Sequence, residues 1–223
     1  IIIKLNNLND IEVNNTVVKA ETSYNLMKLA ALATRLGLTG LEFATGIPGT
    51  VGGAVFMNAG AYKSDMGYVI SKIKVLTPDL KIKEMYNKEL DFHYRTSFLQ
   101  KNKGYICLEA TIVLKHGDKV SMKEVIEDRK KRRLMSQPLE FPSAGSVFRN
   151  PEDLFAGKLI EDCGLKGKKI GGAQISPKHA NFVVNVGNAT ANDIKELITL
   201  AKDEVKEKFN VELKIEQEFV NWE

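Results

Sequence analysis

The sequence has few of the residues that mark a disulfide scaffold or a metal centre. Its 223 residues include two cysteines, Cys107 and Cys163, and three histidines, which form no Cys-x-x-Cys pair and no Cys/His cluster. We therefore expect no disulfide framework and no structural metal site. Free thiols are typical of a reducing compartment, so the expected location is the cytoplasm.

Long apolar runs, a signal peptide, internal repeats and low-complexity tracts are absent as well. Nothing in the chain is long and apolar enough to cross a bilayer, so membrane insertion is not expected. Hydrophobic residues form 43% and charged residues 27% of the chain, which is ordinary for a globular protein of one large or two modest domains. The net charge of +4 does not require nucleic acid and would suit an anionic small molecule.

An initial methionine is also missing, and the first residues, Ile-Ile-Ile-Lys, are typical of a strand already in progress. We therefore interpret the chain as the C-terminal part of a longer protein. Alternation of apolar and polar residues over 1–20 and 69–115 predicts strands and hairpins. Between them, residues 23–36 fit a helix that Ser23 caps and Gly37 ends. Its apolar stripe consists of Leu26, Leu29, Ala30 and Ala33.

A second unit is expected to begin near Gly117. Ser121 and Glu124 can form a capping box at the start of a helix over 122–134. The prolines that follow this segment would end the helix.

The rest of the second unit mixes turns and short strands over 143–190 with an amphipathic helix over 191–208. A last strand-like segment carries one apolar face, made of Val211, Leu213, Ile215 and Phe219. Together with the first unit, this pattern predicts an α+β architecture.

The glycine-rich segment GIPGTVGGAVFMNAGAY, residues 46–62, is the first candidate site. It matches neither the Gly-x-Gly-x-x-Gly fingerprint nor a P-loop, and residues 46–61 contain no Lys or Arg. An anion would therefore be held by backbone N–H groups near a helix start at Thr50, which suits a dinucleotide pyrophosphate better than a transferable γ-phosphate. A tight structural turn packed under a helix explains the same residues about equally well.

Ser146 lies in SAGSVFRNP, a segment at 143–151 that does not match the Gly-x-Ser-x-Gly nucleophile motif. None of the three histidines has a recognisable hydrolase context, and a serine without a base is a poor nucleophile. Ser146 could still donate a proton to a strongly basic carbanion. The sequence alone favours a turn serine that bonds its own backbone.

Three further charged features are candidates. Arg95, in the run Tyr-Arg-Thr-Ser, could bind a carboxylate or phosphate with two hydrogen bonds, although a surface ion pair is more usual. The basic run 129–133 wraps around a helix, so a solvated face is favoured over an anion-steering patch. Glu216 lies on the strand face opposite the apolar residues, either as an exposed glutamate, which the pattern favours, or as the floor of a cleft.

Five segments, taken together and in this order, resemble the UDP-N-acetylenolpyruvoylglucosamine reductase family. They are GLTGLEFATGIPGTVGGAVFMNAGAY, YRTS, QPLEFPSAGSVFRNP, AGKLIEDCGLKGKKIGGAQISPKHANFVVN and VELKIEQEF, and they span residues 37–219. The resemblance implies an α+β protein with an FAD-binding domain, incomplete at its N-terminus, in residues 1–116. A smaller α+β substrate-binding domain follows in residues 117–218, and residues 219–223 form a tail that returns to the FAD-binding part.

The resemblance also implies a flavoenzyme of peptidoglycan precursor synthesis in the bacterial cytoplasm. NADPH would reduce FAD, and reduced FAD would pass hydride to C3 of the enolpyruvyl group of UDP-N-acetylglucosamine enolpyruvate, giving UDP-N-acetylmuramate. Two alternatives stay open: a non-catalytic fragment that binds a UDP-sugar or nucleotide, and another flavin-dependent oxidoreductase with a different substrate. The segment SAGSVFRNP, which belongs to the substrate half of the family, counts against the second alternative.

Site residues follow from the same resemblance. FAD would be held by Gly46, Ile47, Pro48, Gly49, Thr50, Gly52, Gly53 and Ala54. Ser146 would protonate C2, while the pair Arg95 and Glu216 would polarise the substrate carboxylate and stabilise the enolate-like intermediate. Glu218 is the alternative position for the glutamate. The residues expected to contact the substrate are Tyr94, Arg149 and Asn150.

Overall fold

In the computed structural model, which describes residues 2–220, the chain divides within one long helix, α4 (Lys119–Ser136). One unit runs to Lys130 and the other begins at Lys131. The border predicted between residues 116 and 117 lies just before the same helix, and the domain limits stay a prediction. Part of the predicted tail, residues 221–223, lies outside the described residues.

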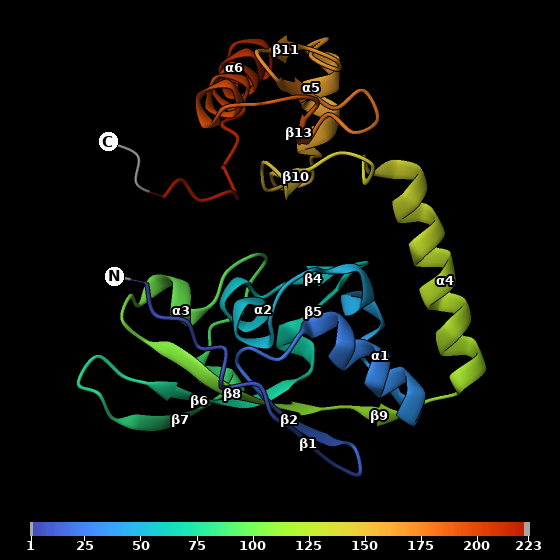
Figure 1. Cartoon of the computed structure of the whole chain (residues 1–223), viewed down its shortest axis with the longest axis vertical. Coiled ribbons are helices and arrows are strands. Elements are labelled where there is room, and N and C mark those ends of the chain that lie inside the picture. The colour runs from blue at the N-terminus through green and yellow to red at the C-terminus, as the bar shows by residue number, and fades with distance from the viewer. Residues whose placement is uncertain (1, 221–223) are drawn as a thin grey trace. The chain divides into compact units, whose positions relative to one another are not determined.

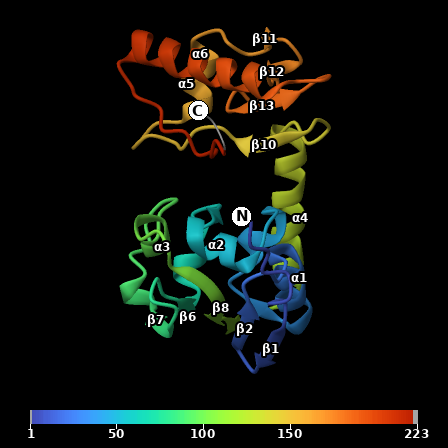
Figure 2. The same ribbon diagram turned by 60° about the vertical axis from the view of Figure 1, so that its left-hand side comes forward.

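The first unit is built on a five-stranded antiparallel sheet in the order β1-β2-β8-β6-β7. Helices α1 and α2 cover one face of this sheet (Figures 1 and 2). The bounds of these elements are β1 Ile11–Asn14, β2 Val17–Glu21, α1 Leu26–Leu36, α2 Val51–Met57, β6 Ile70–Leu76, β7 Ile82–Tyr86 and β8 Ile106–Val113. Strands in the described part of residues 1–20 therefore occur only from Ile11 onward.

Short elements connect the strands and helices of this unit. They are β3 Leu38–Thr39, which pairs with β9 Lys115–His116; β4 Gly60–Ala61, which pairs with β5 Ser64–Asp65; the 3-10 turns Glu42–Gly46, Met66–Tyr68 and Asn87–Glu89; and α3 Phe98–Lys101. The 3-10 turn Glu42–Gly46 leads into the glycine segment.

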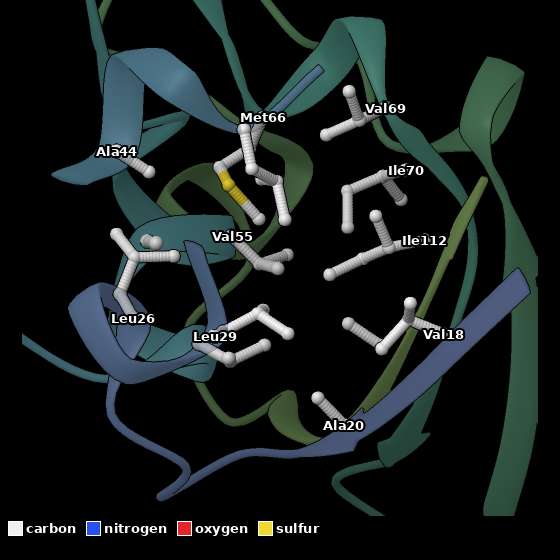
Figure 3. Close-up of a cluster of buried hydrophobic side chains, with 14 of the residues drawn as sticks. Val18, Ala20, Leu26, Leu29, Ala44, Val55, Met66, Val69, Ile70 and Ile112 are labelled. Carbon is white, nitrogen blue, oxygen red and sulfur yellow. The ribbon is translucent and has the colours of Figure 1, made fainter. Parts of the chain in front are cut away.

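The core of the first unit lies between the sheet and the two helices (Figure 3). Val18 and Ile112 project from the sheet toward Leu29 of α1 and Val55 of α2, and all four are at most 1% exposed. On the opposite face, lysines and glutamates of neighbouring strands form ion pairs, as between Lys19 and Glu12 at 3.1 Å. The alternation of apolar and polar residues in the sequence therefore corresponds to one buried and one solvated face of the sheet.

Helix α1 confirms the predicted helix and its buried stripe, and Gly37 ends it with φ 75°. The predicted cap is wrong. Asn25, not Ser23, caps the helix, because the Asn25 side chain accepts a hydrogen bond from the N–H of Lys28 at 2.9 Å. The Ser23 hydroxyl instead donates to the carbonyl oxygen of Leu5 at 2.7 Å.

Helix α4 begins before its predicted start at residue 122. The Asp118 carboxylate accepts hydrogen bonds from the N–H of Ser121 at 2.7 Å and from its hydroxyl at 2.8 Å. These bonds lower the pKa of Asp118. The predicted capping box of Ser121 and Glu124 is therefore wrong, because the carboxylate three residues earlier takes the position of the cap.

The second unit contains a four-stranded sheet in the order β10-β13-β12-β11, with helices α5 and α6 packed against it. The elements are β10 Ser143–Ser146, α5 Ala156–Asp162, β11 Lys169–Ile170, β12 Ala173–Ile175, β13 Phe182–Asn185 and α6 Ala191–Phe209. Helix α6 confirms the predicted amphipathic helix, and Thr190 and Asp193 form its capping box. Helix α5 was not predicted, since the region was expected to hold only turns and short strands.

The C-terminal segment pairs with the residues after β10. The N–H of Arg149 donates to the carbonyl oxygen of Lys214 at 2.9 Å, and the N–H of Glu216 donates to that of Val147 at 2.8 Å. Leu213 is buried, whereas Phe219 is 37% exposed and lies outside the core. The predicted apolar face thus ends at Ile215. No helix within residues 2–220 is long and apolar enough to span a membrane.

Candidate functional site

The glycine segment enters helix α2 through an exposed loop, Pro48–Gly49–Thr50. Gly49 has φ 144°, which disfavours any residue with a Cβ, and no atom lies within 4 Å of the place where a Cβ would be. Thr50 caps α2, because its hydroxyl oxygen accepts a hydrogen bond from the N–H of Gly53 at 3.2 Å. The loop is therefore open to solvent on the side where Gly49 lacks a side chain.

The first turn of α2 packs against the backbone that precedes α1. The N–H of Val51 donates to the carbonyl oxygen of Tyr24 at 2.9 Å, and the N–H of Gly52 donates to that of Thr22 at 2.8 Å. A Cβ on Gly52 would lie 1.8 Å from the Thr22 hydroxyl oxygen. The close approach of two backbone segments thus explains why position 52 is a glycine. For this residue the structural explanation of the glycine segment, tight packing, applies.

The N–H groups of Gly49 and Thr50 differ from those of the first turn of α2. Within residues 2–220 neither has an intramolecular hydrogen-bond acceptor, and both residues are exposed. Two consecutive donors beside an open surface with no Cβ and no charged side chain fit a diphosphate. The loop therefore suits a diphosphate better than the first turn of α2, whose amides already have partners.

Tyr94 and Arg95 are the central residues of a tight hairpin. It is closed by hydrogen bonds between His93 and Thr96, at 3.1 Å from the N–H of His93 and at 3.0 Å from the N–H of Thr96. The Arg95 guanidinium donates to the carbonyl oxygen of Gly60 at 2.8 Å, and its Cζ lies 5.2 Å from the Tyr94 ring centroid. This contact joins Arg95 to the segment that follows α2.

Asn58 supports this hairpin and is not among the residues predicted from the sequence. Asn58 is buried, ends α2 with φ 41°, and donates from its side chain to the carbonyl oxygen of His93 at 2.9 Å. Its side-chain oxygen accepts from the N–H of Gly67 at 2.9 Å. An asparagine after a helix is a known end signal, and that pattern could have identified Asn58.

Ser146 lies in the second unit, where it is exposed at the end of β10. It lines a pocket of 340 Å³ together with Asn150. Three lysines from separate parts of the unit line the same pocket: Lys158, Lys166 and Lys178. Lys166 forms an ion pair with the Glu161 carboxylate at 2.9 Å. Lys158 likewise pairs with Asp162, and Lys178 with Glu140 at 3.7 Å. Among the lining residues lysines outnumber acidic residues, which favours an anionic ligand.

His179 forms part of the same pocket wall. Its Nδ1 accepts a hydrogen bond from the N–H of Asn181 at 3.2 Å, so the neutral ring carries its proton on Nε2. Burial, and to a smaller degree the charge of Lys166, lower the pKa of His179. The neutral imidazole is therefore the form that the pocket favours at pH 7.

Asn181 fixes the chain just after Ser146. It is buried, its side-chain oxygen accepts from the N–H of Phe148 at 2.9 Å, and its side-chain nitrogen donates to the carbonyl oxygen of Phe148 at 2.8 Å. On the other side, the same segment pairs with the segment that contains Glu216. Ser146 is thus followed by an extended segment that is hydrogen-bonded along both edges.

Glu216 is half-buried, whereas the sequence pattern favoured full exposure. Its neighbour Gln217 donates from its side chain to the carbonyl oxygen of Gly145 at 3.3 Å, which brings the terminal segment beside Ser146. Glu218, the alternative position, is exposed. Asn150 accepts from the N–H of Ala156 at 3.1 Å and so also supports the start of α5.

The expected site residues therefore fall into two groups. The glycine loop, Tyr94 and Arg95 belong to the first unit; Ser146, Arg149, Asn150 and Glu216 belong to the second. In the first group Arg95 bonds Gly60, and in the second the segment after Ser146 pairs with the segment of Glu216. Their roles toward cofactor and substrate stay predictions.

Comparisons with known proteins agree with the order of the two units. A family model described as FAD binding domain matches residues 1–86, and one described as UDP-N-acetylenolpyruvoylglucosamine reductase, C-terminal domain, matches residues 137–220. The predicted α+β architecture, an FAD-binding domain followed by a smaller domain, is thereby confirmed.

Relatives of known name are similar to almost the whole chain. A UDP-N-acetylenolpyruvoylglucosamine reductase from Anoxybacillus flavithermus is 48% identical over 221 residues, which cover 99% of this chain and 73% of the relative. One from Clostridium perfringens is 48% identical over 216 residues, covering 97% and 71%. The crystal structure of such a reductase from Thermus caldophilus matches with a TM-score of 0.80 and 36% identity, over 90% of this chain and 71% of that one. The chain belongs to the UDP-N-acetylenolpyruvoylglucosamine reductase family.

Proposed function

We propose that this chain carries out the family reaction, the NADPH-dependent and FAD-dependent reduction of UDP-N-acetylglucosamine enolpyruvate to UDP-N-acetylmuramate, a step of peptidoglycan precursor synthesis. Relatives that bear the name of this enzyme are 48% identical over nearly all of the chain. No comparison supports a non-catalytic, nucleotide-binding fragment. The observation that connects the reaction with individual residues is the lysine-rich pocket that contains Ser146.

The loop at Gly49 and Thr50 is the part of the first unit that would hold the FAD diphosphate. Its two unoccupied N–H groups, within the described chain, can donate to phosphate oxygens. The remaining expected contacts, from Gly46 through Ala54, flank this loop on both sides. When bound, FAD supplies the hydride that is added to C3 of the enolpyruvyl group.

The pocket around Ser146 would hold the anionic substrate. Lys158, Lys166 and Lys178 would exchange their carboxylate partners for the diphosphate of the substrate, and Asn150 and His179 add polar groups. Arg149 and Tyr94 are the further residues for which we infer substrate contact. Because its ring is neutral and protonated on Nε2, His179 can donate a hydrogen bond without adding charge.

Proton transfer is assigned to Ser146. Hydride addition at C3 leaves negative charge at C2 and on the substrate carboxylate, and the Ser146 hydroxyl donates the proton that C2 takes up. Arg95 would neutralise the developing charge with its guanidinium, and Arg95 and Glu216 as a pair would polarise the substrate carboxylate. Groups fixed before the reaction stabilise such charge most effectively, because they need no reorganisation.

The cytoplasm is the location that we propose. Both cysteines, Cys107 and Cys163, are free thiols, which are typical of a reducing compartment. The proposed ligands are a nucleotide cofactor, a flavin and a UDP-sugar, so the proposal includes no nucleic acid partner and no membrane insertion.

A visible spectrum of the protein mixed with FAD tests this proposal. NADPH added without oxygen should bleach the flavin band, and UDP-N-acetylglucosamine enolpyruvate should then restore it. UDP-N-acetylglucosamine, which lacks the enolpyruvyl group, is the matched control and should leave the flavin reduced. A bleached band that the enolpyruvyl substrate does not restore would contradict the proposed function.

A further inference from the structure

The hairpin that carries Arg95 has an unfavourable backbone conformation. Arg95 has φ 54°, in the left-handed region that residues with a Cβ avoid. It occupies the second central position of the tight turn between His93 and Thr96, where glycine or asparagine is usual. Strained residues of this kind persist only where their surroundings hold them, and they concentrate at functional sites.

The side chains of Asn58, Arg95 and Gln100 connect this turn to other segments. Asn58 donates to the carbonyl oxygen of His93 at 2.9 Å, and Arg95 itself donates to that of Gly60 at 2.8 Å. Gln100, in the short helix α3, donates from its side-chain nitrogen to the carbonyl oxygen of Arg95 at 3.0 Å. Of these contacts, only that of Gln100 is made to the backbone of the strained residue, Arg95.

The same nitrogen of Gln100 also bonds the end of helix α2. It donates to the carbonyl oxygen of Phe56 at 2.9 Å and lies 3.6 Å from the sulfur of Met57. An amide nitrogen has two hydrogens, which match the two carbonyl acceptors at Arg95 and Phe56. Gln100 therefore ties the Arg95 turn to the last turn of α2.

Helix α2 begins at the glycine loop and ends at these contacts. Its seven residues, Val51–Met57, span about 10 Å at the rise of an α-helix. The position of Arg95 relative to the glycine loop is consequently set by one short, rigid element and by the bonds at its end. A change in those bonds would move Arg95 without altering the loop at Gly49.

We propose that Gln100 is a positioning residue for the reduction of the enolpyruvyl group: its side-chain amide fixes Arg95 at the distance from the flavin site that the substrate requires. This inference rests on the proposed role of Arg95. It assigns no contact with substrate or cofactor to Gln100.

Two variants remove the bonds in different ways. Gln100→Met keeps the length of the side chain and loses both donors, while Gln100→Glu places a carboxylate against two carbonyl oxygens. Both should leave flavin reduction by NADPH at the rate of the unchanged protein. Both should slow reoxidation of the flavin by the enolpyruvyl substrate roughly 10- to 100-fold, because small misplacements of a catalytic group have effects of this size.

Ser97→Ala is the matched control. The buried Ser97 hydroxyl donates at 2.6 Å to the same Phe56 carbonyl oxygen. Its removal should lower the melting temperature and leave the reoxidation rate within about two-fold. A Gln100 variant that slows both half-reactions equally, or that behaves as Ser97→Ala does, would show that Gln100 only stabilises the fold and would overturn the inference.

A double-variant comparison tests whether Gln100 acts through Arg95. Arg95→Lys should slow reoxidation, and adding Gln100→Met to it should slow the reaction no further. Independent, multiplying losses would contradict the inference. If Arg95→Lys itself reoxidises at the normal rate, the proposed role of Arg95 fails instead, so the two failures are distinguishable.

Discussion

The N–H of Glu216 donates to the carbonyl oxygen of Val147 at 2.8 Å, and Val147 directly follows Ser146. Residues from the middle and from the end of the chain are therefore neighbours in one pair of extended segments. This relationship places Glu216 beside Ser146, the proposed proton donor, although the two residues are about seventy positions apart in the sequence.

The first prediction separates Glu216 from Glu218. Glu216→Gln should slow flavin reoxidation by the enolpyruvyl substrate roughly 100- to 1,000-fold, because the preorganised carboxyl group proposed to act on the substrate carboxylate would be lost. Glu218→Gln should react at nearly the normal rate, since Glu218 is exposed and Glu216 is half-buried. Stopped-flow absorbance of the flavin measures both rates, and a larger loss in Glu218→Gln would move the assignment to that residue.

The second prediction concerns packing at the glycine loop. Gly52→Ala should destabilise the protein by about 1–3 kcal/mol, because the new Cβ would overlap the Thr22 hydroxyl and crowd a backbone oxygen. Gly53→Ala is the control: the site is exposed, and a Cβ there would lie 3.3 Å from the Thr50 hydroxyl oxygen. Urea unfolding of both variants compares their stabilities. Equal stabilities would contradict the close packing of Gly52 against Thr22.

The third prediction is a pH dependence from His179. Burial lowers its pKa in the folded protein below that in the unfolded chain. The unfolded state therefore binds more protons below about pH 6.5, and stability should fall as the pH drops through that value. Above it, His179 should contribute no pH dependence, because the ring is neutral in both states.

Melting temperatures between pH 5 and pH 8 check this prediction. His179→Asn keeps a side-chain oxygen that can accept the N–H of Asn181, and it removes the titrating ring. The variant should lose part of the decline in stability below pH 6.5. An unchanged decline would assign the pH dependence to other groups.

The sequence predicts the long elements of this protein well and the short ones poorly. The helices at 26–36 and 191–209 carry clear stripes that their packing confirms, including Leu29 and Leu197. Local chemistry alone could not place the cap of the first helix: Ser23 and Asn25 are both good cap residues, and the competing bond of Ser23 to Leu5 comes from the fold. Helix α5 has only two turns, too few for a period to be recognised.

The candidate site likewise depends partly on contacts that have no local signal in the sequence. The resemblance pointed to Ser146 and Arg95 because each lies in a distinctive run of residues. The lysines of the Ser146 pocket come from α5 and from two separate loops, so only the folded chain brings Lys158, Lys166 and Lys178 together. The anchoring of Phe148 by Asn181 joins residues 33 positions apart and has no local signal in the sequence.

The central claim is that Ser146 donates the proton, and Ser146→Ala tests it most directly. In stopped-flow experiments without oxygen, NADPH should reduce the flavin of this variant at the normal rate, while the enolpyruvyl substrate should fail to reoxidise it at a comparable rate. Ser143→Ala, in the same strand, is the control and should complete both half-reactions. Normal reoxidation in Ser146→Ala, or loss of flavin reduction together with reoxidation, would contradict the account.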